Sequence, residues 1–264
     1  MRLSCLIVPA AHLLDLLPAA LSAHLIPARR LEEKGGDKRG FVATALPQLD
    51  ALLGGGWPRG VVSELAGPRS SGRTSILHAS LAGALKGGGV AALVDAEQAF
   101  DARLAARAGV PLARLLWVHA PGMQALRAAE LLIDAGGFDL VALDIGDKNP
   151  RLPDAAWVRL RHGAKRQRTV ALVVTATPLV RAFASVAVIL SRQGVDFGER
   201  QRFSRNVQIY SAAPALLTGL RSNIALGRGR APADGADHCS IEFSVMAQLI
   251  ETEDRNQPQA RRKR

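Results

Sequence analysis

The sequence is poor in cysteine and in aromatic residues: its 264 positions include two cysteines, Cys5 and Cys239, and only 4% Phe, Trp and Tyr. With only these two thiols, the sequence argues against a disulfide-stabilised scaffold and fits a reducing compartment. The few large rings are scattered, whereas proteins that hold single-stranded nucleic acid interleave aromatic and basic side chains. Binding of unstacked bases is therefore only a secondary expectation.

An uninterrupted apolar run that could cross a membrane is also missing. The most apolar early stretch, residues 3–14, contains Pro9 and is shorter than the roughly 20 residues that a membrane-spanning helix needs. It follows a single basic residue and lacks a small-x-small cleavage site, so it is a poor signal peptide. We expect a cytoplasmic protein with no membrane partner.

Apolar mass and positive charge are what the sequence has in quantity. Hydrophobic residues make up 48% of the chain, which excludes a disordered protein, and the length suits one sizeable domain. The net charge is +11, and the segment from Arg151 to Arg230 carries all of it, with 14 Lys/Arg against 3 Asp/Glu. Such a segment indicates a face for polyanions or for an acidic protein surface, although a solvated basic face without a partner would have the same composition.

Apolar runs alternate with helical periods through the middle of the chain. Strands are predicted at residues 61–66, 90–94, 115–119, 140–143 and 170–174, and helices at 73–86, 102–108, 122–135 and 154–167. Fully apolar strands alternating with helices predict an α/β fold with a mostly parallel central sheet, covered on both faces. The later candidates at 185–191, 207–210, 223–226 and 240–245 predict antiparallel strands at the sheet edge.

Three segments are expected from these patterns. Residues 1–40 read as an N-terminal helix and a linker, because apolar residues recur at helical spacing in 10–23 and a mixed-charge, Gly-containing run follows. Residues 41–250 form the core. Residues 251–264 are polar and end in four basic residues, which predicts a disordered basic tail.

The segment Gly67-Pro68-Arg69-Ser70-Ser71-Gly72-Arg73-Thr74 has the spacing of the phosphate-binding loop G-x-x-x-x-G-K-[ST], with arginine in place of lysine. Glycines let backbone N–H groups face an anion, and the following helix adds its positive N-terminal end. The residues predicted to bind a nucleotide here are Gly67, Ser70, Ser71, Gly72, Arg73, Thr74 and Ser75. A glycine-rich turn that binds nothing is the alternative.

The arginine at position 73 bears on hydrolysis more than on binding. A guanidinium is larger than an ammonium and planar, so it places its charge differently in the transition state, while the backbone cradle is unaffected. Two carboxylates follow predicted strands of the same sheet. Asp144, together with Thr74, is expected to hold Mg²⁺, and Glu97 is a candidate base for activating water.

Around this loop the sequence resembles the core of the bacterial RecA recombinase over residues 44–192. The matching residues are Leu49-Asp50, Gly54-Gly55-Gly56, Pro58-Arg59-Gly60, Glu64, Gly67-Pro68, Ser70-Ser71-Gly72, Thr74, Asp95-Ala96-Glu97, Ala99, Asp101, Ala184-Ser185-Val186 and Ser191-Arg192. The resemblance implies a RecA-like P-loop core that binds ATP and Mg²⁺. It also implies that Glu97 activates water and that Asp101 contacts adenine.

The departures from RecA are equally specific. Thr175-Ala176-Thr177 stands where RecA has an Asn-Gln pair that senses the γ-phosphate, and both DNA-binding loops are shortened. With these losses the chain is similar to the ImuA family, RecA-like accessory proteins of mutagenic translesion synthesis in the SOS response. ATP hydrolysis is then expected to be weak or absent.

The ImuA resemblance implies three protein partners: the RecA recombinase, a polymerase-related mutasome subunit and a DNA polymerase. Nonspecific DNA contact through the segment from Arg151 to Arg230 and through the basic tail is a further expectation. Two other functions stay open at this point. One is an active DNA-dependent ATPase of the RecA type, and the other is a damage-inducible inhibitor of cell division.

Overall fold

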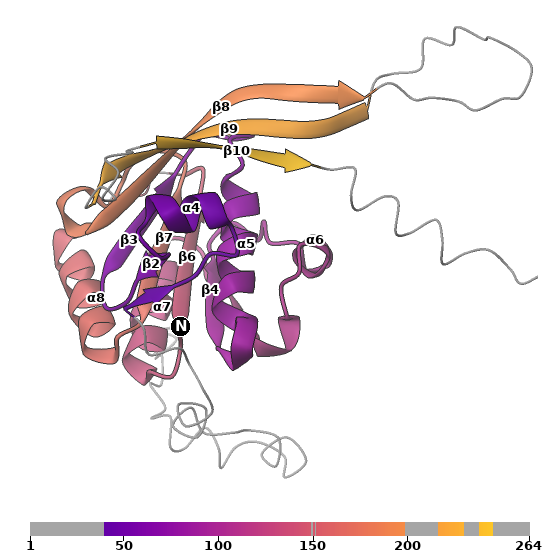
Figure 1. Ribbon diagram of the computed structural model, residues 1–264. Helices are drawn as coiled ribbons and strands as arrows, with labels where there is room; N and C mark the ends of the chain where they lie inside the picture. Colours follow the sequence, from indigo (N-terminus) through magenta and orange to yellow (C-terminus); the bar gives the residue numbers. More distant parts are fainter. Residues whose placement is uncertain (1–39, 149, 151, 199–215, 230–237, 245–264) are drawn as a thin grey trace, which may run out of the picture.

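A central sheet of eight strands organises the computed structural model, which describes residues 40–148, 150, 152–198, 216–229 and 238–244 (Figure 1). The strands are β3 (Val62–Ala66), β4 (Ala91–Asp95), β5 (Leu115–His119), β6 (Leu140–Gly146), β7 (Val170–Thr175), β8 (Val186–Gly198), β9 (Leu216–Arg228) and β10 (His238–Ser244). Their order across the sheet is β10-β9-β8-β3-β7-β6-β4-β5. Strands β3 to β8 pair in parallel, and β9 and β10 continue the sheet antiparallel. The predicted fold class is confirmed.

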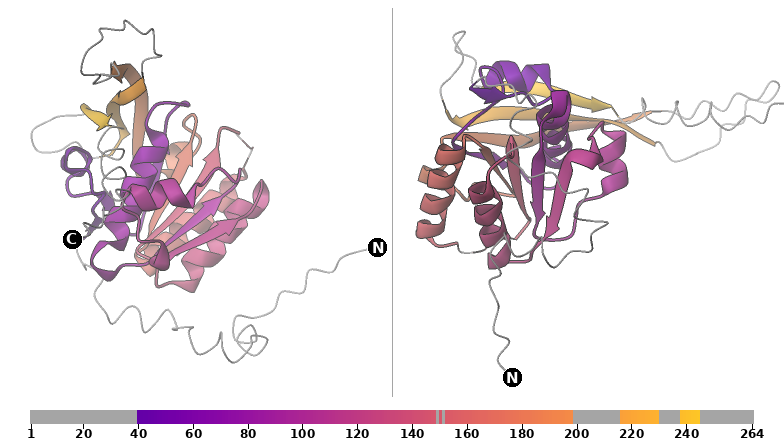
Figure 2. Two further views of the ribbon diagram at one scale, coloured as in Figure 1. Left: turned by 90° about the vertical axis from the view of Figure 1, so that its right-hand side faces the viewer. Right: turned by 90° about the horizontal axis from the view of Figure 1, so that it is seen from below.

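Helices cover both faces of the parallel part (Figure 2). The helices are α5 (Arg73–Leu85) and α6 (Ala102–Arg107), which contribute to one buried apolar cluster, and α7 (Met123–Ala135) and α8 (Asp154–Gln167), which contribute to the other. Alternate residues of each central strand feed the two clusters: in β4, Leu93 packs into the first and Val94 into the second. Because side chains alternate between faces, a strand buried on both sides is mostly apolar, as these strands are apart from a few buried polar residues such as Glu64 and Asp95.

The region after β7 differs from the sequence-based prediction. Residues 185–191 were expected to form an antiparallel edge strand, but β8 pairs in parallel with β3 and lies inside the sheet. Its first half is apolar on both faces and is covered, with Val188 and Leu190 buried. Its second half pairs with β9 in a ribbon that extends beyond the core (Figure 1).

Several short elements connect this framework. They are β1 (Phe41–Val42), α4 (Pro47–Leu52), β2 (Trp57–Pro58) and the 3₁₀ turns η1 (Lys86–Gly88), η2 (Leu112–Arg114) and η3 (Arg181–Phe183). Trp57 is fully buried, and its indole N–H donates to the Ser80 hydroxyl at 2.9 Å, which ties the antiparallel pair β1–β2 to α5. The predicted N-terminal helix, the strand candidate at 207–210 and the basic tail lie outside the described residues. Among the helices that are described, none has the length and apolar character to cross a membrane.

A buried carboxylate holds the loop after β7 against the sheet. Glu64 lies in the middle of β3 with almost no exposed surface, and one of its oxygens accepts hydrogen bonds from the backbone N–H groups of Leu179 and Val180 (2.9 Å for Val180). The Thr175 hydroxyl donates to the same oxygen at 3.4 Å. Glu64 therefore fixes the chain between β7 and β8.

We predict that Glu64→Ala lowers the free energy of unfolding by about 2–4 kcal/mol, because it leaves one buried and one partly buried N–H group without an acceptor. Glu64→Gln keeps a side-chain oxygen and should lose less than half as much. Urea denaturation followed by circular dichroism measures both values. Wild-type stability of the alanine variant would contradict the assigned role.

Candidate nucleotide-binding site

The loop between β3 and α5 has the geometry of an anion cradle. Ser70 and Gly72 have left-handed backbone angles (φ +59° and +85°), and the N–H of Ile76 makes the first intrahelical bond, to Gly72 O at 3.0 Å. The N–H groups of the preceding helical residues therefore have no partner within the helix. They lie at its positive end, where anions are favoured.

The predicted loop residues are brought together around one hollow of about 250 Å³. Its lining is Pro68, Arg69, Ser70, Gly72, Arg73, Thr74 and Ser75 of the loop and helix, with Leu220 of β9. Gly67 and Ser71 lie buried within the loop. The volume is below the roughly 300–1,000 Å³ of sites that enclose a whole small molecule. It suits the phosphate part of a nucleotide.

A buried hydroxyl in the loop supports this interpretation. Ser71 is fully buried, and its Oγ makes no hydrogen bond within the described part of the chain. A Cβ at Gly67 would come within 2.5 Å of that oxygen, so the absence of a side chain at Gly67 leaves it room. Buried polar groups normally have partners, and an unpaired hydroxyl close to the free N–H groups at the start of α5 fits a site for phosphate.

Strand β10 closes the loop from the other side. A Cβ at Gly72 would lie 2.6 Å from a ring carbon of Phe243 and 3.2 Å from the Ser222 hydroxyl of β9. A glycine is thus required at position 72 for two reasons: the backbone has a positive φ there, and the Phe243 ring leaves no room for a side chain. The antiparallel extension of the sheet therefore shapes the phosphate loop.

Arg73 replaces the lysine of the motif, and its guanidinium forms hydrogen bonds with other groups of the protein. Its Nη1 donates to Gly67 O at 2.7 Å and its Nη2 to Asp147 Oδ1 at 2.9 Å, and only 13% of the side chain is exposed. Arg69 binds the other oxygen of Asp147 through Nε. One carboxylate thus receives both arginines of the loop. Hydrogen bonds from Arg69 and then Arg73 hold the pKa of Asp147 below its usual value.

Asp147 is the residue that the sequence interpretation missed. It follows β6, 74 positions after Arg73, and only the fold brings the two together. A sequence signal did exist, since an arginine placed in a loop that normally holds lysine needs an acceptor for its additional donors. An acidic residue soon after another strand of the same parallel sheet is a candidate for this acceptor.

Asp144 lies inside β6 rather than after it, contrary to the sequence-based expectation. The strand continues to Gly146, and Asp144 is paired with Asp95 of β4 and Val174 of β7. Burial raises the pKa of Asp144 to about 6, while a hydrogen bond from the Gly146 N–H and the charge of Arg73 act in the opposite direction. Asp144 is therefore a poorly solvated carboxyl near the arginine of the loop.

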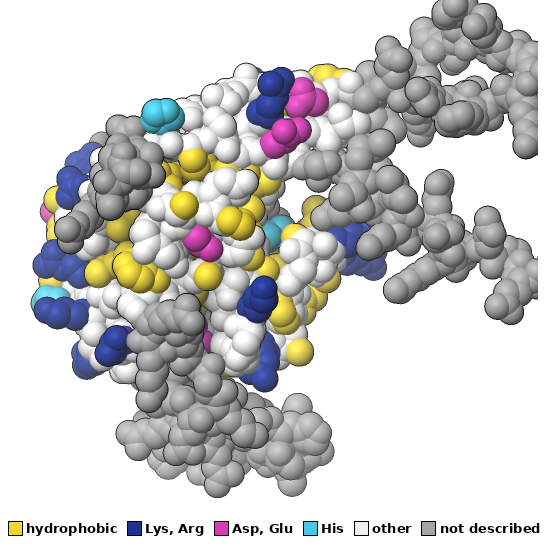
Figure 3. All heavy atoms as spheres, in the orientation of Figure 1, with side chains coloured by type: hydrophobic (Ala, Val, Ile, Leu, Met, Phe, Trp, Pro, Cys, Tyr) yellow, Lys and Arg dark blue, Asp and Glu magenta, His cyan; other side chains and the backbone are white. Residues whose placement is uncertain are grey.

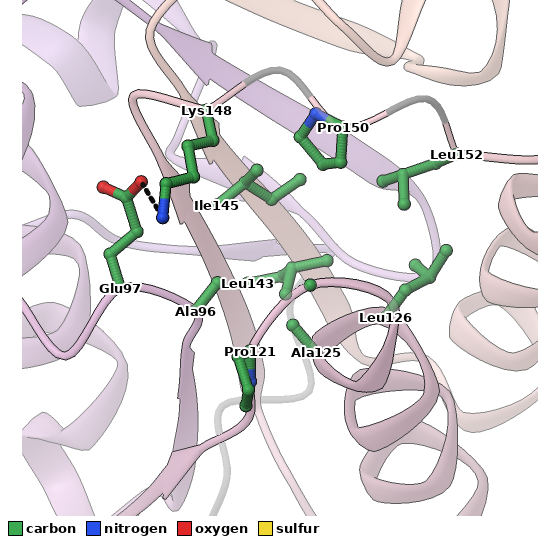
Figure 4. Close-up of a pocket in the computed structure, with 11 residues that line it drawn as sticks. Ala96, Glu97, Pro121, Ala125, Leu126, Leu143, Ile145, Lys148, Pro150 and Leu152 are labelled. Atoms are coloured by element: carbon green, nitrogen blue, oxygen red, sulfur yellow. Dashed lines mark ion pairs between the residues drawn. The ribbon is translucent and has the colours of Figure 1, made fainter.

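Glu97 lies between the end of β4 and the segment after β6. Its Oε2 accepts the N–H of Asp147 at 3.2 Å, and its Oε1 is 3.9 Å from Lys148 Nζ (Figure 4). Gly146 leaves room for this carboxylate, because a Cβ there would lie 2.1 Å from Oε2. Its role as a base that activates water stays a prediction.

Two further aspartates position the chain beside Glu97. Asp95 is buried and accepts hydrogen bonds from the N–H groups of Glu97, Ala99 and Phe100, which fixes the turn after β4. Asp101 caps α6 by accepting the N–H groups at positions 103 and 104 at 2.8 and 3.1 Å. The predicted adenine contact of Asp101 stays a prediction, and any such contact would have to be compatible with the cap.

The residues suit a magnesium ion only in combination with a nucleotide. Within the described ranges, no group of three or more His, Cys, Asp or Glu side chains could hold a metal. Mg²⁺ usually binds one or two carboxylates together with substrate phosphates. Asp144 and the exposed Thr74 hydroxyl are the residues that would hold it, and the ion would neutralise phosphate charge there.

Sequence comparison matches residues 31–150 to the family described as the RecA N-terminal domain. The chain is 47% identical to Protein RecA of Chlorobaculum parvum over 106 residues, which are 39% of this chain and 30% of that relative. For Protein RecA of Clavibacter michiganensis the values are 44% over 116 residues, 42% of this chain and 32% of the relative. The chain thus spans about a third of the length of these curated relatives.

Structural comparison extends the similarity beyond the phosphate loop. The crystal structure of the RadB recombinase superposes with a TM-score of 0.55 at 18% identity, covering 79% of this chain and 97% of the other. The chain therefore has a RecA-like α/β fold with a mostly parallel sheet and antiparallel edge strands. The sequence similarity to RecA thus covers residues 31–150, and the structural match adds the likeness of the fold.

The elevated pKa of Asp144 predicts a pH-dependent stability. The folded chain keeps this carboxyl protonated up to about pH 6, whereas its usual pKa is 3.8, so stability falls as the pH rises through this window. Asp144→Asn removes the buried ionisable carboxyl and keeps a side-chain oxygen that accepts the Gly146 N–H. We expect it to stabilise the protein by about 2 kcal/mol near pH 7.5 and by less near pH 5. Thermal unfolding of both proteins at both pH values checks this, and a gain independent of pH would contradict it.

Proposed function

We propose that this protein is a RecA-like accessory factor of mutagenic translesion DNA synthesis in the SOS response, which binds nucleotide weakly and acts by contacting other proteins. The observation that carries the proposal is that the core fold is retained while the phosphate loop is altered at Arg73. The sheet and the anion cradle are kept, while the arginine of the phosphate loop is bound by Asp147 instead of extending as a free cation. Efficient ATP hydrolysis needs positive charge placed on the transferring phosphate, so this arrangement favours an adaptor over a motor.

The short connection after β7 points in the same direction. Residues 176–185 alone separate β7 from β8, and Glu64 holds part of this connection against the sheet. A long mobile loop for gripping single-stranded DNA has no room there. This supports the proposal over an active recombinase, which would need such a loop.

An exposed strand edge provides a surface for protein partners. β5 is the last strand of the sheet and pairs only with β4 among the described strands. Leu116 and Trp117 of this strand are 44% and 46% exposed. An edge with apolar side chains and free backbone groups favours pairing with another chain. The proposed partners are the RecA recombinase, the polymerase-related mutasome subunit and DNA polymerase.

We predict that the purified protein binds RecA filaments but turns over little ATP, with no increase when single-stranded DNA is added. Leu116→Glu places a charge on the edge of β5 and should weaken filament binding at least about tenfold. Leu131→Glu is the matched control, because Leu131 is 56% exposed on the helix α7 and does not belong to β5, so it should change nothing. Biolayer interferometry and a phosphate-release assay measure the two properties.

Robust DNA-stimulated turnover that is lost in Glu97→Gln would contradict the adaptor role and favour a recombinase-type ATPase. Binding to the division GTPase in place of RecA filaments would instead favour an inhibitor of cell division. Equal filament binding by both leucine variants would exclude the β5 edge as the docking surface.

A second proposed contact, with DNA phosphates, follows from the charges on α8. Lys and Arg side chains gather on the side of the molecule where α8 lies (Figure 3). Arg159 and Arg166 are neutralised by Glu130 and Asp134 of α7, at 3.0 and 2.8 Å. Arg161 and Lys165 are exposed on the same helix, and no described carboxylate lies within ion-pair distance of them. Unpaired basic groups release counterions when they bind phosphates. Arg161 and Lys165 are therefore better candidates for DNA contact than the ion-paired Arg159 and Arg166.

The double variant Arg161→Ala/Lys165→Ala should weaken binding to duplex DNA about tenfold and lower the slope of log K against log salt by about 2. Arg159→Ala/Arg166→Ala changes the net charge equally but removes paired groups, so it should bind nearly as tightly as the wild type. Fluorescence anisotropy over a series of salt concentrations measures both. Equal losses in the two variants would show that net charge, and not this face of α8, governs binding.

A further inference from the structure

Asp147 connects two parts of the site through two different groups. Its carboxylate binds Arg69 and Arg73 of the phosphate loop, and its backbone N–H donates to Glu97 at the end of β4. About a quarter of the Asp147 side chain is exposed, against 13% of Arg73. The aspartate therefore forms the accessible side of a partly buried ion pair.

The chemistry of these contacts is that of phosphate binding. A guanidinium donates paired hydrogen bonds to the oxygens of a carboxylate or of a phosphate in the same way. Asp147 thus occupies donors of Arg69 and Arg73 that an incoming phosphate would also use. Asp147 does not occupy the backbone N–H groups at the start of α5, so the two anions compete for the arginines alone.

We propose that Asp147 is an internal counter-anion that sets the affinity of the loop for nucleotide phosphates by competing for Arg73 and Arg69. The inference rests on the proposed nucleotide site and adds its regulation. Phosphate binding draws the arginines away from Asp147. By reciprocity, the ligand weakens the Asp147 contacts by the same factor as Asp147 weakens the ligand.

The release of Asp147 acts on the segment that follows it. Lys148, Pro150 and Leu152 line a hollow of about 170 Å³ whose floor is formed by Leu143 and Ile145 of β6 (Figure 4). Pro150 and Leu152 also line a second hollow of about 480 Å³ beside Trp157 of α8. Pro150 and Leu152 therefore have open space on two sides, which leaves room for their side chains to shift. Phosphate binding is thereby coupled to a surface at the carboxyl ends of β6 and β7.

Isothermal titration of the full chain with ATP, ADP and pyrophosphate tests the competition. Asp147→Asn should bind each about tenfold more tightly than the wild type, because the competing charge is gone. Asp147→Glu keeps the charge and should stay near the wild type. Asp134→Asn is the control, since Asp134 also pairs with an arginine, Arg166, but away from the loop. It should leave the affinity unchanged.

Equal or weaker binding by Asp147→Asn, with the wild type binding normally, would overturn the inference and leave the nucleotide site standing. If neither the wild type nor Asp147→Asn bound any of the three anions, the inference and the proposed nucleotide site would both be contradicted. Circular dichroism confirms that the variants are folded before these outcomes are read.

Backbone hydrogen exchange tests the coupling to the residues after Asp147, because a change of charge confined to the phosphate loop would not alter exchange there. In the wild type, ATP should increase exchange at the Asp147 N–H and in the peptide that contains Lys148 to Leu152. In Asp147→Asn this peptide should already exchange faster without ligand. Exchange that is the same in all three conditions would overturn the coupling to the hollows.

Discussion

The ion pair between Arg73 and Asp147 is the contact on which the site depends. In the usual phosphate loop a lysine extends toward the anion as a compact charge. Here the guanidinium is largely buried and is held by a carbonyl of its own loop and by Asp147. Losing one partner of such a pair leaves the other poorly solvated, so the arginine and the aspartate have to be understood together.

The parallel sheet explains why these groups meet. The carboxyl ends of β3, β4 and β6 lie at one edge, and each is followed by a functional segment: the phosphate loop, the turn with Glu97, and Asp147. Ligands in open α/β sheets bind at this edge for the same reason. The antiparallel strands β9 and β10 enclose the phosphate loop on one side, where Phe243 packs directly on Gly72.

Local sequence patterns were sufficient for most of the core. The phosphate loop, the alternation of apolar strands with helices and the bounds of α8 follow from spacing and periodicity, which act over a few residues. The Arg73–Asp147 pair and the Gly72–Phe243 contact join residues far apart in the chain, so no local pattern contains them. The direction of β8 was mispredicted because an apolar run of five residues fits an edge strand or an interior one equally well. Asp144 was expected at the end of its strand because the apolar run stops at Leu143, but β6 continues to Gly146, and burial of Asp144 inside the strand raises its pKa.

The central claim is that the cradle still binds phosphate and that Arg73 is shared between phosphate and Asp147. A crystal structure of the protein with a non-hydrolysable ATP analogue and Mg²⁺ tests it most directly. The account predicts phosphates on the N–H groups at the start of α5, with the guanidinium of Arg73 turned from Asp147 toward them. An intact Arg73–Asp147 pair beside a cradle without phosphate, at saturating analogue, would contradict it.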